Sequence, residues 1–369
     1  MAPNTTTTTE TVSEQFQKLD LKALAREKGA YQVYPKTKYP PLEAFEHDDP
    51  GKRADPKKAS LYDNATKIFD MTPALGTTIE GLQLSQLTDQ QKNDLALLAA
   101  ERGVVFFPNQ DIDPYQGVEF GRYFGPLHIH NTTGHPENLP EVTSIFHDET
   151  KPQVVQFLEA RSADEAWHSD ITYEQQPAGL TFLKIDTLPP MGGDTMWASA
   201  YEAYDRLSPA MQKFVEGLEA VHDGQIHQDR SRRAGTFIRR DFVESTHPVV
   251  RTHPLTGWKG LFVQPGFTKR IVGLSNKESR LMLDFLFKHV SGGHDFQLRF
   301  KWTEDTVAVW DNRATFHCAI FDYFTAKLGR RHGWRVTPTA EKPYFDPNSK
   351  SRRQDLAEKA ALAASAKKE

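Results

Sequence analysis

Short strand-like segments separated by turn residues recur along most of this chain. The apolar run at 104–107 and the alternating runs at 296–300 and 306–310 are rich in β-branched and aromatic residues, which favour extended backbone. Helix-like and strand-like segments do not alternate regularly enough for a doubly wound parallel sheet. The pattern therefore predicts a mainly β protein with helical insertions, built on an antiparallel sandwich or barrel.

Similar signals predict the other elements. Further strands are expected at 77–84, 127–130, 141–146, 167–173, 179–185, 195–197, 247–251, 260–263 and 333–337. Helices are expected at 89–102, 114–124, 199–218 and 275–286, with capping-box sequences at Thr88, Ser199 and Ser275. In the third helix, the apolar residues Leu207, Met211, Phe214 and Leu218 are spaced for the core. The polar stretch 223–245, dense in Arg and His, is expected to be a mobile loop.

The distribution of polar residues predicts one main domain with a flanking segment at each end. Residues 1–60 contain a threonine tract at 5–9 and scattered prolines, so we expect a polar N-terminal arm that is partly disordered. Residues 61–345 contain the periodic segments and are expected to form the folded domain. Residues 346–369 are rich in Lys, Arg and Ala, and we expect a charged C-terminal tail.

Charge and cysteine content argue against several classes of partner. The net charge of −4 gives no electrostatic reason to expect a nucleic acid or an anionic membrane. No apolar run approaches the roughly 20 residues of a membrane span. Cys318 is the only cysteine, which rules out an intrachain disulfide, and the chain begins without the features of a secretory signal. A cytoplasmic protein without nucleic-acid or membrane partners is expected.

The stretch 167–173 contains a histidine and an aspartate two positions apart, His168 and Asp170. On a strand such side chains emerge on the same face. Imidazole and carboxylate together suit Fe(II), Mn(II) or Zn(II), and a third ligand would complete a two-His-one-carboxylate face with open positions opposite. An isolated pair of this kind is more often a surface pair or a hydrogen-bonded core histidine, so the spacing alone leaves both alternatives open.

A second polar region lies near the end of the domain. A buried strand and a turn at 309–313 lead to one histidine, His317, and further on Arg331 and Arg335 are candidates to bind anions. Cys318, next to His317 on a predicted strand, is expected to be a small buried residue that faces away from any metal.

Five motifs occur in one order over roughly residues 76–345. They are His168–Asp170, Pro177–Gly179, Gly192–Trp197, Trp310–Arg313 leading to His317, and Arg331–Thr337. With these motifs the sequence closely resembles the taurine dioxygenase family of Fe(II)/2-oxoglutarate-dependent oxygenases. The resemblance implies a double-stranded β-helix, or jelly roll, over residues 61–345.

The resemblance also implies the catalytic residues. His168, Asp170 and His317 would hold Fe(II), while 2-oxoglutarate and O2 would occupy the open positions. Thr195 and Arg331 would bind the distal carboxylate of 2-oxoglutarate, which a guanidinium matches with two parallel hydrogen bonds.

For the substrate, the resemblance implies that Arg335 and His130 bind a sulfonate, although His130 could instead be a core histidine. Thr133, Asp164 and Ile171 complete the candidate substrate-binding set. The bacterial enzymes have a tyrosine and an asparagine at the positions of Thr133 and Asp164, so we do not expect strict taurine specificity. The expected reaction hydroxylates the carbon next to a sulfonate and yields sulfite, an aldehyde, succinate and CO2, as in a fungal-type sulfonate dioxygenase.

Three alternatives stay open. The same chemistry could act on an aryloxyacetate, a purine or a carboxylated metabolite, because Arg335 would also bind a carboxylate. A non-enzymatic anion-binding β-sandwich is a more distant alternative. A zinc hydrolase is disfavoured, since no general base stands next to the predicted triad. Family members form dimers or tetramers, so a homo-oligomer is expected.

Overall fold

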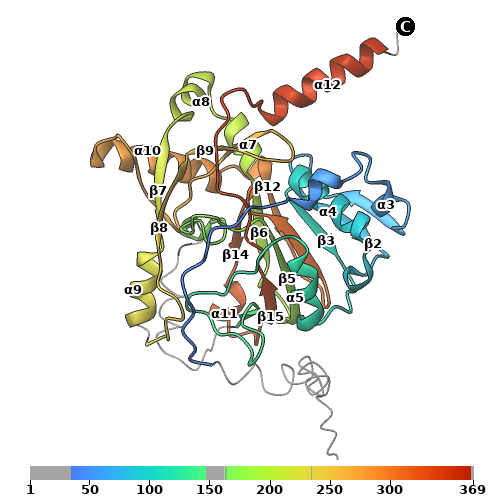
Figure 1. Ribbon diagram of the computed structural model, residues 1–369, viewed down its shortest axis with the longest axis vertical. Coiled ribbons are helices and arrows are strands. Elements are labelled where there is room, and N and C mark those ends of the chain that lie inside the picture. The colour runs from blue at the N-terminus through green and yellow to red at the C-terminus, as the bar shows by residue number, and fades with distance from the viewer. Residues whose placement is uncertain (1–34, 147–161, 163, 234, 367–369) are drawn as a thin grey trace, which may run out of the picture.

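A computed structural model describes residues 35–146, 162, 164–233 and 235–366 (Figure 1). The threonine tract and its predicted disorder lie outside the described residues. Within the described ranges, no helix is both long and apolar enough to cross a membrane.

The largest sheet has the strand order β1-β2-β3-β13-β5-β15-β4. Its strands are β1 (Lys67–Asp70), β2 (Thr77–Glu80), β3 (Val104–Phe107), β4 (Thr143–Ile145), β5 (Leu180–Thr187), β13 (Val307–Asp311) and β15 (His332–Val336). All pairs are antiparallel except β2 with β3. The central strands β3 and β13 are buried along their whole length, which explains their continuous apolar runs.

Three smaller sheets complete the β structure of the described residues. They are β12-β6-β14, β11-β7-β8 and β10-β9, formed by β6 (Thr195–Ser199), β7 (Glu219–Asp223), β8 (Glu244–Pro248), β9 (Val250–Thr252), β10 (Lys259–Leu261), β11 (Thr268–Ile271), β12 (Gln297–Phe300) and β14 (Thr315–Ala319). Trp197 of β6 contacts Phe106 and Trp310 of the large sheet, with ring centroids 5.4 and 5.8 Å apart. The core therefore lies between β6 and the large sheet, as the predicted sandwich requires.

Most of the helices lie around this core, whereas α12 projects away from it (Figure 1). They are α3 (Ala59–Tyr62), α4 (Asp89–Arg102), α5 (Pro114–Arg122), α7 (Ala200–Asp205), α8 (Pro209–Val215), α9 (Gln225–Arg233), α10 (Asn276–Ser291), α11 (Asp322–Thr325) and α12 (Arg352–Ala366), with short 3-10 turns η1 (Pro50–Arg53), η2 (Leu84–Gln86), η3 (Asp164–Ala166) and η4 (His294–Phe296). The capping boxes at Thr88 and Ser275 are confirmed. Helix α5 packs closely on β15, because a Cβ on Gly117 would lie 2.4 Å from the Trp334 ring.

Several predicted elements differ from the structure. In the segment 167–173, His168 forms only an isolated bridge to His317, and residues 170–173 form a turn rather than a strand, because Ile171 adopts a left-handed φ of 47°. In the expected strand 127–130 only Leu127 pairs, through an isolated bridge to Pro338. The strand predicted at 77–84 ends at Glu80.

Two helical predictions also change. The helix expected at 199–218 is divided into α7 and α8, because Ser208 caps a new helix that starts at Pro209. Phe214 is 44% exposed and is not part of the core. The stretch 223–245, expected to be a mobile loop, contains helix α9 and the buried residues Arg239 and Arg240, so it is not a loop along its whole length.

Candidate metal centre and substrate cavity

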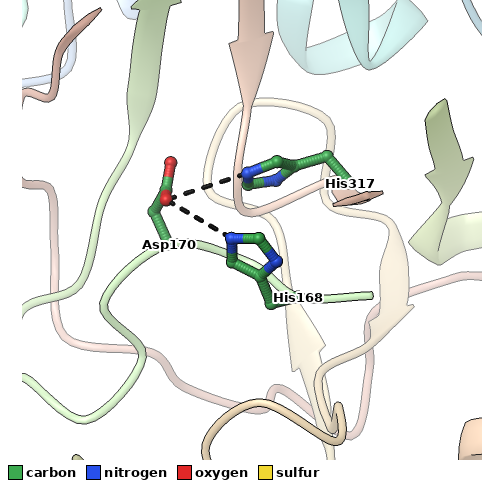
Figure 2. A group of neighbouring side chains, drawn as sticks. All are labelled: His168, Asp170 and His317. Atoms are coloured by element: carbon green, nitrogen blue, oxygen red, sulfur yellow. Dashed lines mark ion pairs between the residues drawn. The ribbon is translucent and has the colours of Figure 1, made fainter. Parts of the chain in front are cut away.

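Two backbone hydrogen bonds bring His168 and His317 together. The amide of each residue donates to the carbonyl of the other, at 3.0 and 2.8 Å, and the two ring centroids are 4.1 Å apart. Asp170 Oδ1 lies 3.8 Å from Nε2 of both histidines (Figure 2). One donor atom from each residue lies within 4.8 Å of the others. The three side chains therefore offer two imidazoles and a carboxylate to a common point, a donor set that suits Fe(II).

Neighbouring groups orient these three side chains. His168 Nδ1 donates to the Ala166 carbonyl at 2.8 Å, which leaves the Nε2 lone pair directed toward Asp170. The Asp170 amide donates to Asn312 Oδ1 at 3.0 Å, and Asp170 Oδ2 accepts from Thr181 Oγ1 at 3.3 Å. Asp170 is thus held through its backbone amide and its Oδ2, while Oδ1, which also accepts from Arg335 Nη1, faces the two histidines.

The electrostatic environment keeps Asp170 ionised. Burial alone would raise its pKa, but the Arg335 guanidinium and the two imidazoles hold the pKa well below its usual range. Arg335 Nη1 donates to Asp170 Oδ1 at 2.7 Å. The Nε of Arg335 is buried and has no hydrogen-bond partner within the described part of the chain, which leaves a donor for an anion.

A second arginine lies buried beside β6. Arg331 Nε donates to the Gly193 carbonyl at 2.9 Å, and its Nη2 donates to Thr195 Oγ1 at 3.3 Å. Trp302 Nε1 donates to the same hydroxyl at 2.9 Å. Burial lowers the pKa of Arg331, and no described carboxylate forms an ion pair with it. Because a buried guanidinium without a counterion is unfavourable, this position suits an anionic ligand.

His130 is positioned as a neutral hydrogen-bond donor. Its Nδ1 accepts from the amides of Thr132 and Thr133, at 3.2 and 2.9 Å, so the ring proton lies on Nε2. Burial and the nearby Arg335 hold the pKa of His130 well below its usual value. The ring can therefore donate one hydrogen bond to an anion without carrying charge.

One cavity of about 890 Å³ contains most of the residues proposed from the sequence. Its lining includes His130, Thr133, Asp164, His168, Asp170, Ile171, Arg331 and Arg335. Thr195 and His317 reach the site through their contacts with Arg331 and Asp170. Cys318, on β14, is buried as predicted.

Sequence reasoning missed two groups of residues. Asn312 belongs to a motif used for the resemblance, but its contact with Asp170 was not foreseen. His227, Phe242 and Phe267 also line the cavity, and the first two come from the stretch expected to be a loop. Aromatic residues in that stretch were the available signal, although nothing in the sequence places them near Asp170.

A second cluster, of His47, Asp49 and Glu341, also has donor atoms close enough for a metal. Arg313 occupies its centre, with Nη1 lying 2.6 Å from Asp49 Oδ2 and 3.1 Å from Glu341 Oε2. Arg313 also pairs with Asp311 at 2.7 Å. Because Arg313 and Arg251 already form ion pairs with these carboxylates, the cluster is a buried ion-pair network that joins the segment before η1 to the turn after β13.

Comparisons with known proteins support one family. The family described as "Taurine catabolism dioxygenase TauD, TfdA family" matches residues 67–337. An alpha-ketoglutarate-dependent sulfonate dioxygenase of Saccharomyces cerevisiae is 40% identical over 340 residues, covering 89% of this chain and 82% of the relative. The alpha-ketoglutarate-dependent dioxygenase cnsP of Penicillium expansum is 42% identical, covering 83% and 85%.

A solved structure extends this similarity to the fold. The crystal structure of a taurine dioxygenase from Burkholderia xenovorans matches with a TM-score of 0.64 and 31% identity, covering 77% of this chain and 92% of that one. The jelly-roll architecture predicted from the sequence is confirmed by this match.

Proposed function

The chain belongs to the taurine catabolism dioxygenase TauD, TfdA family, and on this premise we propose that it hydroxylates the carbon next to a sulfonate, using 2-oxoglutarate, Fe(II) and O2. The observation that carries the proposal is the joint position of the triad and two arginines. His168 and Asp170 line one cavity with Arg331 and Arg335, and each arginine has a feature that suits an anion. The reaction uses two anions, the cosubstrate 2-oxoglutarate and the sulfonate substrate. It therefore needs two anion-binding positions.

The residues for the metal follow from the donor set. Fe(II) would be held by His168, Asp170 and His317. When bound, it supplies the redox chemistry that couples O2 and 2-oxoglutarate to hydroxylation of a C–H bond, with succinate and CO2 as coproducts. Thr181 and Asn312 keep the Asp170 carboxylate aimed at the metal position.

The remaining residues bind and orient the two anions. Arg331, aided by Thr195, would bind the distal carboxylate of 2-oxoglutarate. Arg335 Nε and His130 Nε2 would donate to the sulfonate. This holds the carbon next to sulfur close to the triad. After hydroxylation, the hydroxyl proton leaves, the C–O bond becomes a carbonyl, and sulfite departs with the electrons of the C–S bond.

A carboxylated or other anionic substrate is the second candidate. Arg335 would bind a carboxylate as readily as a sulfonate, and the name of the Penicillium relative, at 42% identity, mentions no sulfonate. A non-enzymatic anion-binding protein is a weaker candidate, because simple binding does not require a metal triad.

The decisive experiment measures sulfite and succinate together. Purified protein with Fe(II), 2-oxoglutarate and O2 is expected to release both in equal amounts from at least one alkylsulfonate. Succinate from a carboxylated substrate without sulfite from any sulfonate would favour the second candidate. A separate anaerobic titration with Fe(II) and 2-oxoglutarate is expected to give a visible charge-transfer band that His168→Ala abolishes, and its absence from iron-loaded wild-type protein would contradict the assigned triad.

Two further properties belong to this proposal. We assign the enzyme to cytoplasmic sulfur metabolism, in keeping with its buried single cysteine. We also expect a dimer or tetramer, which light scattering of the full chain would test.

A further inference from the structure

Four aromatic side chains form a continuous surface on one side of the cavity. We call Tyr173, His227, Phe242 and Phe267 the aromatic wall. Phe267 lies at its centre, with ring centroids 5.0 Å from Tyr173 and 4.7 Å from His227. The ring centroids of Tyr173 and Phe242 are 5.1 Å apart, and the ring centroid of Phe267 lies 6.4 Å from that of His168. The aromatic wall therefore begins at a candidate metal ligand and extends away from it.

Hydrogen bonds fix the aromatic wall in position. Tyr173 Oη donates to Asn131 Oδ1 at 2.8 Å. Arg240, two residues before Phe242, donates to the same oxygen at 3.3 Å and to Glu174 Oε1 at 3.0 Å. These partners are buried, so Phe242 is anchored by charge-assisted bonds that solvent does not weaken. The wall is thus a preformed surface.

The charges around the aromatic wall do not favour an ammonium group. Asp170 and Glu174, the carboxylates nearest in sequence to Tyr173, are already paired with Arg335 and Arg240. Asp164, Glu165 and Asp284 also line the cavity, but all three are exposed to solvent. An amine placed against the rings would lose water without gaining a described buried carboxylate as a partner, whereas an apolar group would gain contact area.

We propose that the aromatic wall receives an apolar or aromatic group on the substrate, so that this enzyme prefers aryl- or longer alkylsulfonates over aminosulfonates such as taurine. The inference rests on the proposed function, since it assumes that the sulfonate is bound by Arg335 and His130. The size of the cavity agrees with it, because about 890 Å³ is near the upper end of the usual range of about 300–1,000 Å³ for small-molecule sites.

The first test compares three sulfonates that share a two-carbon spacer. They are 2-phenylethanesulfonate, taurine and isethionate, which carry a phenyl, an ammonium and a hydroxyl group at the same position. With the Fe(II)- and 2-oxoglutarate-loaded enzyme, kcat/KM from sulfite release is expected to be at least about tenfold higher for the phenyl compound. An equal or higher value for taurine would overturn the inference while leaving the proposed function intact.

Binding provides a readout that does not depend on turnover. Isothermal titration of the loaded enzyme under nitrogen is expected to show tighter binding and a more negative heat-capacity change for 2-phenylethanesulfonate than for taurine. If no sulfonate releases sulfite, the proposed function fails, and the binding comparison alone then decides the inference. Equal affinities would refute it.

A variant of the aromatic wall tests the assignment to these residues. Phe242→Ala is expected to lower kcat/KM for 2-phenylethanesulfonate about tenfold and to change that for taurine less than about twofold. Phe214→Ala, an exposed phenylalanine of α8 outside the cavity, is the matched control and should change neither. Phe242→Leu serves if the alanine variant does not fold. Similar decreases in kcat/KM for 2-phenylethanesulfonate and taurine would show that Phe242 has only a structural role and would overturn the inference.

Discussion

Replacing Asn312 by alanine tests how the chain aims its candidate metal ligand. The Asn312 side chain accepts from the Asp170 amide at 3.0 Å and from Trp310 Nε1 at 3.1 Å, and it donates to the Gly179 carbonyl at 3.0 Å and to Thr181 Oγ1 at 2.8 Å. Alanine leaves two buried donors without their acceptor. At about 1–3 kcal/mol for each unsatisfied group, we expect the free energy of unfolding to fall by about 2–6 kcal/mol.

The same substitution loosens the Asp170 carboxylate. Loss of an outer-shell partner typically weakens metal affinity by about 10–100-fold, so we expect a loss in that range for Fe(II). Thr181→Val removes the bond to Asp170 Oδ2 and should act in the same direction with a smaller effect. The control is Asn64→Ala, because the Asn64 side chain donates to the Ser60 carbonyl at an exposed site.

Two measurements separate stability from positioning. Denaturant unfolding of the metal-free protein gives the free energy of unfolding, and anaerobic titration of Fe(II) below the melting transition gives the affinity. A folded Asn312→Ala protein that binds Fe(II) as tightly as the wild type would refute the argument that Asn312 orients Asp170.

Other perturbations address the remaining charged groups. Arg331→Lys should raise the KM for 2-oxoglutarate at least about tenfold, because an ammonium cannot replace the two-pronged guanidinium, and an unchanged KM in a succinate assay would contradict that role. Arg335→Gln should raise the KM for the sulfonate more than the KM for 2-oxoglutarate, as measured from initial rates with each of the two compounds varied in turn. A larger increase in the KM for 2-oxoglutarate would mean that the roles of the two arginines are exchanged. His247 is buried, which lowers its pKa to about 4, so the folded protein keeps it neutral while the unfolded chain binds a proton below its usual value of about 6.5. The free energy of unfolding should therefore fall as pH drops from about 6.5 to about 4, and His247 should contribute up to about 3 kcal/mol of this loss. Urea unfolding at several pH values should give a shallower fall for His247→Gln than for the wild type. Equal pH dependence of the two proteins would contradict this reasoning.

Local signals predicted those parts of the fold that depend on local interactions. The capping boxes at Thr88 and Ser275 start α4 and α10 where expected, since a cap involves residues three positions apart. The break before Pro209 was missed because the apolar spacing continues across it. The turn at 170–173 was also missed, since a β-branched residue such as Ile171 rarely adopts a left-handed conformation without tertiary support.

The candidate site likewise contains some residues that the sequence predicted and others that it did not. The triad and both arginines came from ordered motifs, and the structure brings them to one cavity, although their roles stay predictions until tested. Asn312 and the aromatic wall could not be placed, because their positions depend on contacts between distant segments. Phe242, for example, reaches the cavity through the bonds of Arg240 to Asn131 and Glu174.

The backbone bridge between His168 and His317 also determines how late during synthesis the three residues of the candidate site can come together. Its two segments are separated by about half of the folded domain, and β14 is among the last strands to leave the ribosome. The growing chain therefore carries His168 and Asp170 for a long time without the second imidazole, and a pair of ligands holds Fe(II) only weakly. Under the proposed function, all three ligands would therefore be available to Fe(II) only after β14 has paired with the segment of His168.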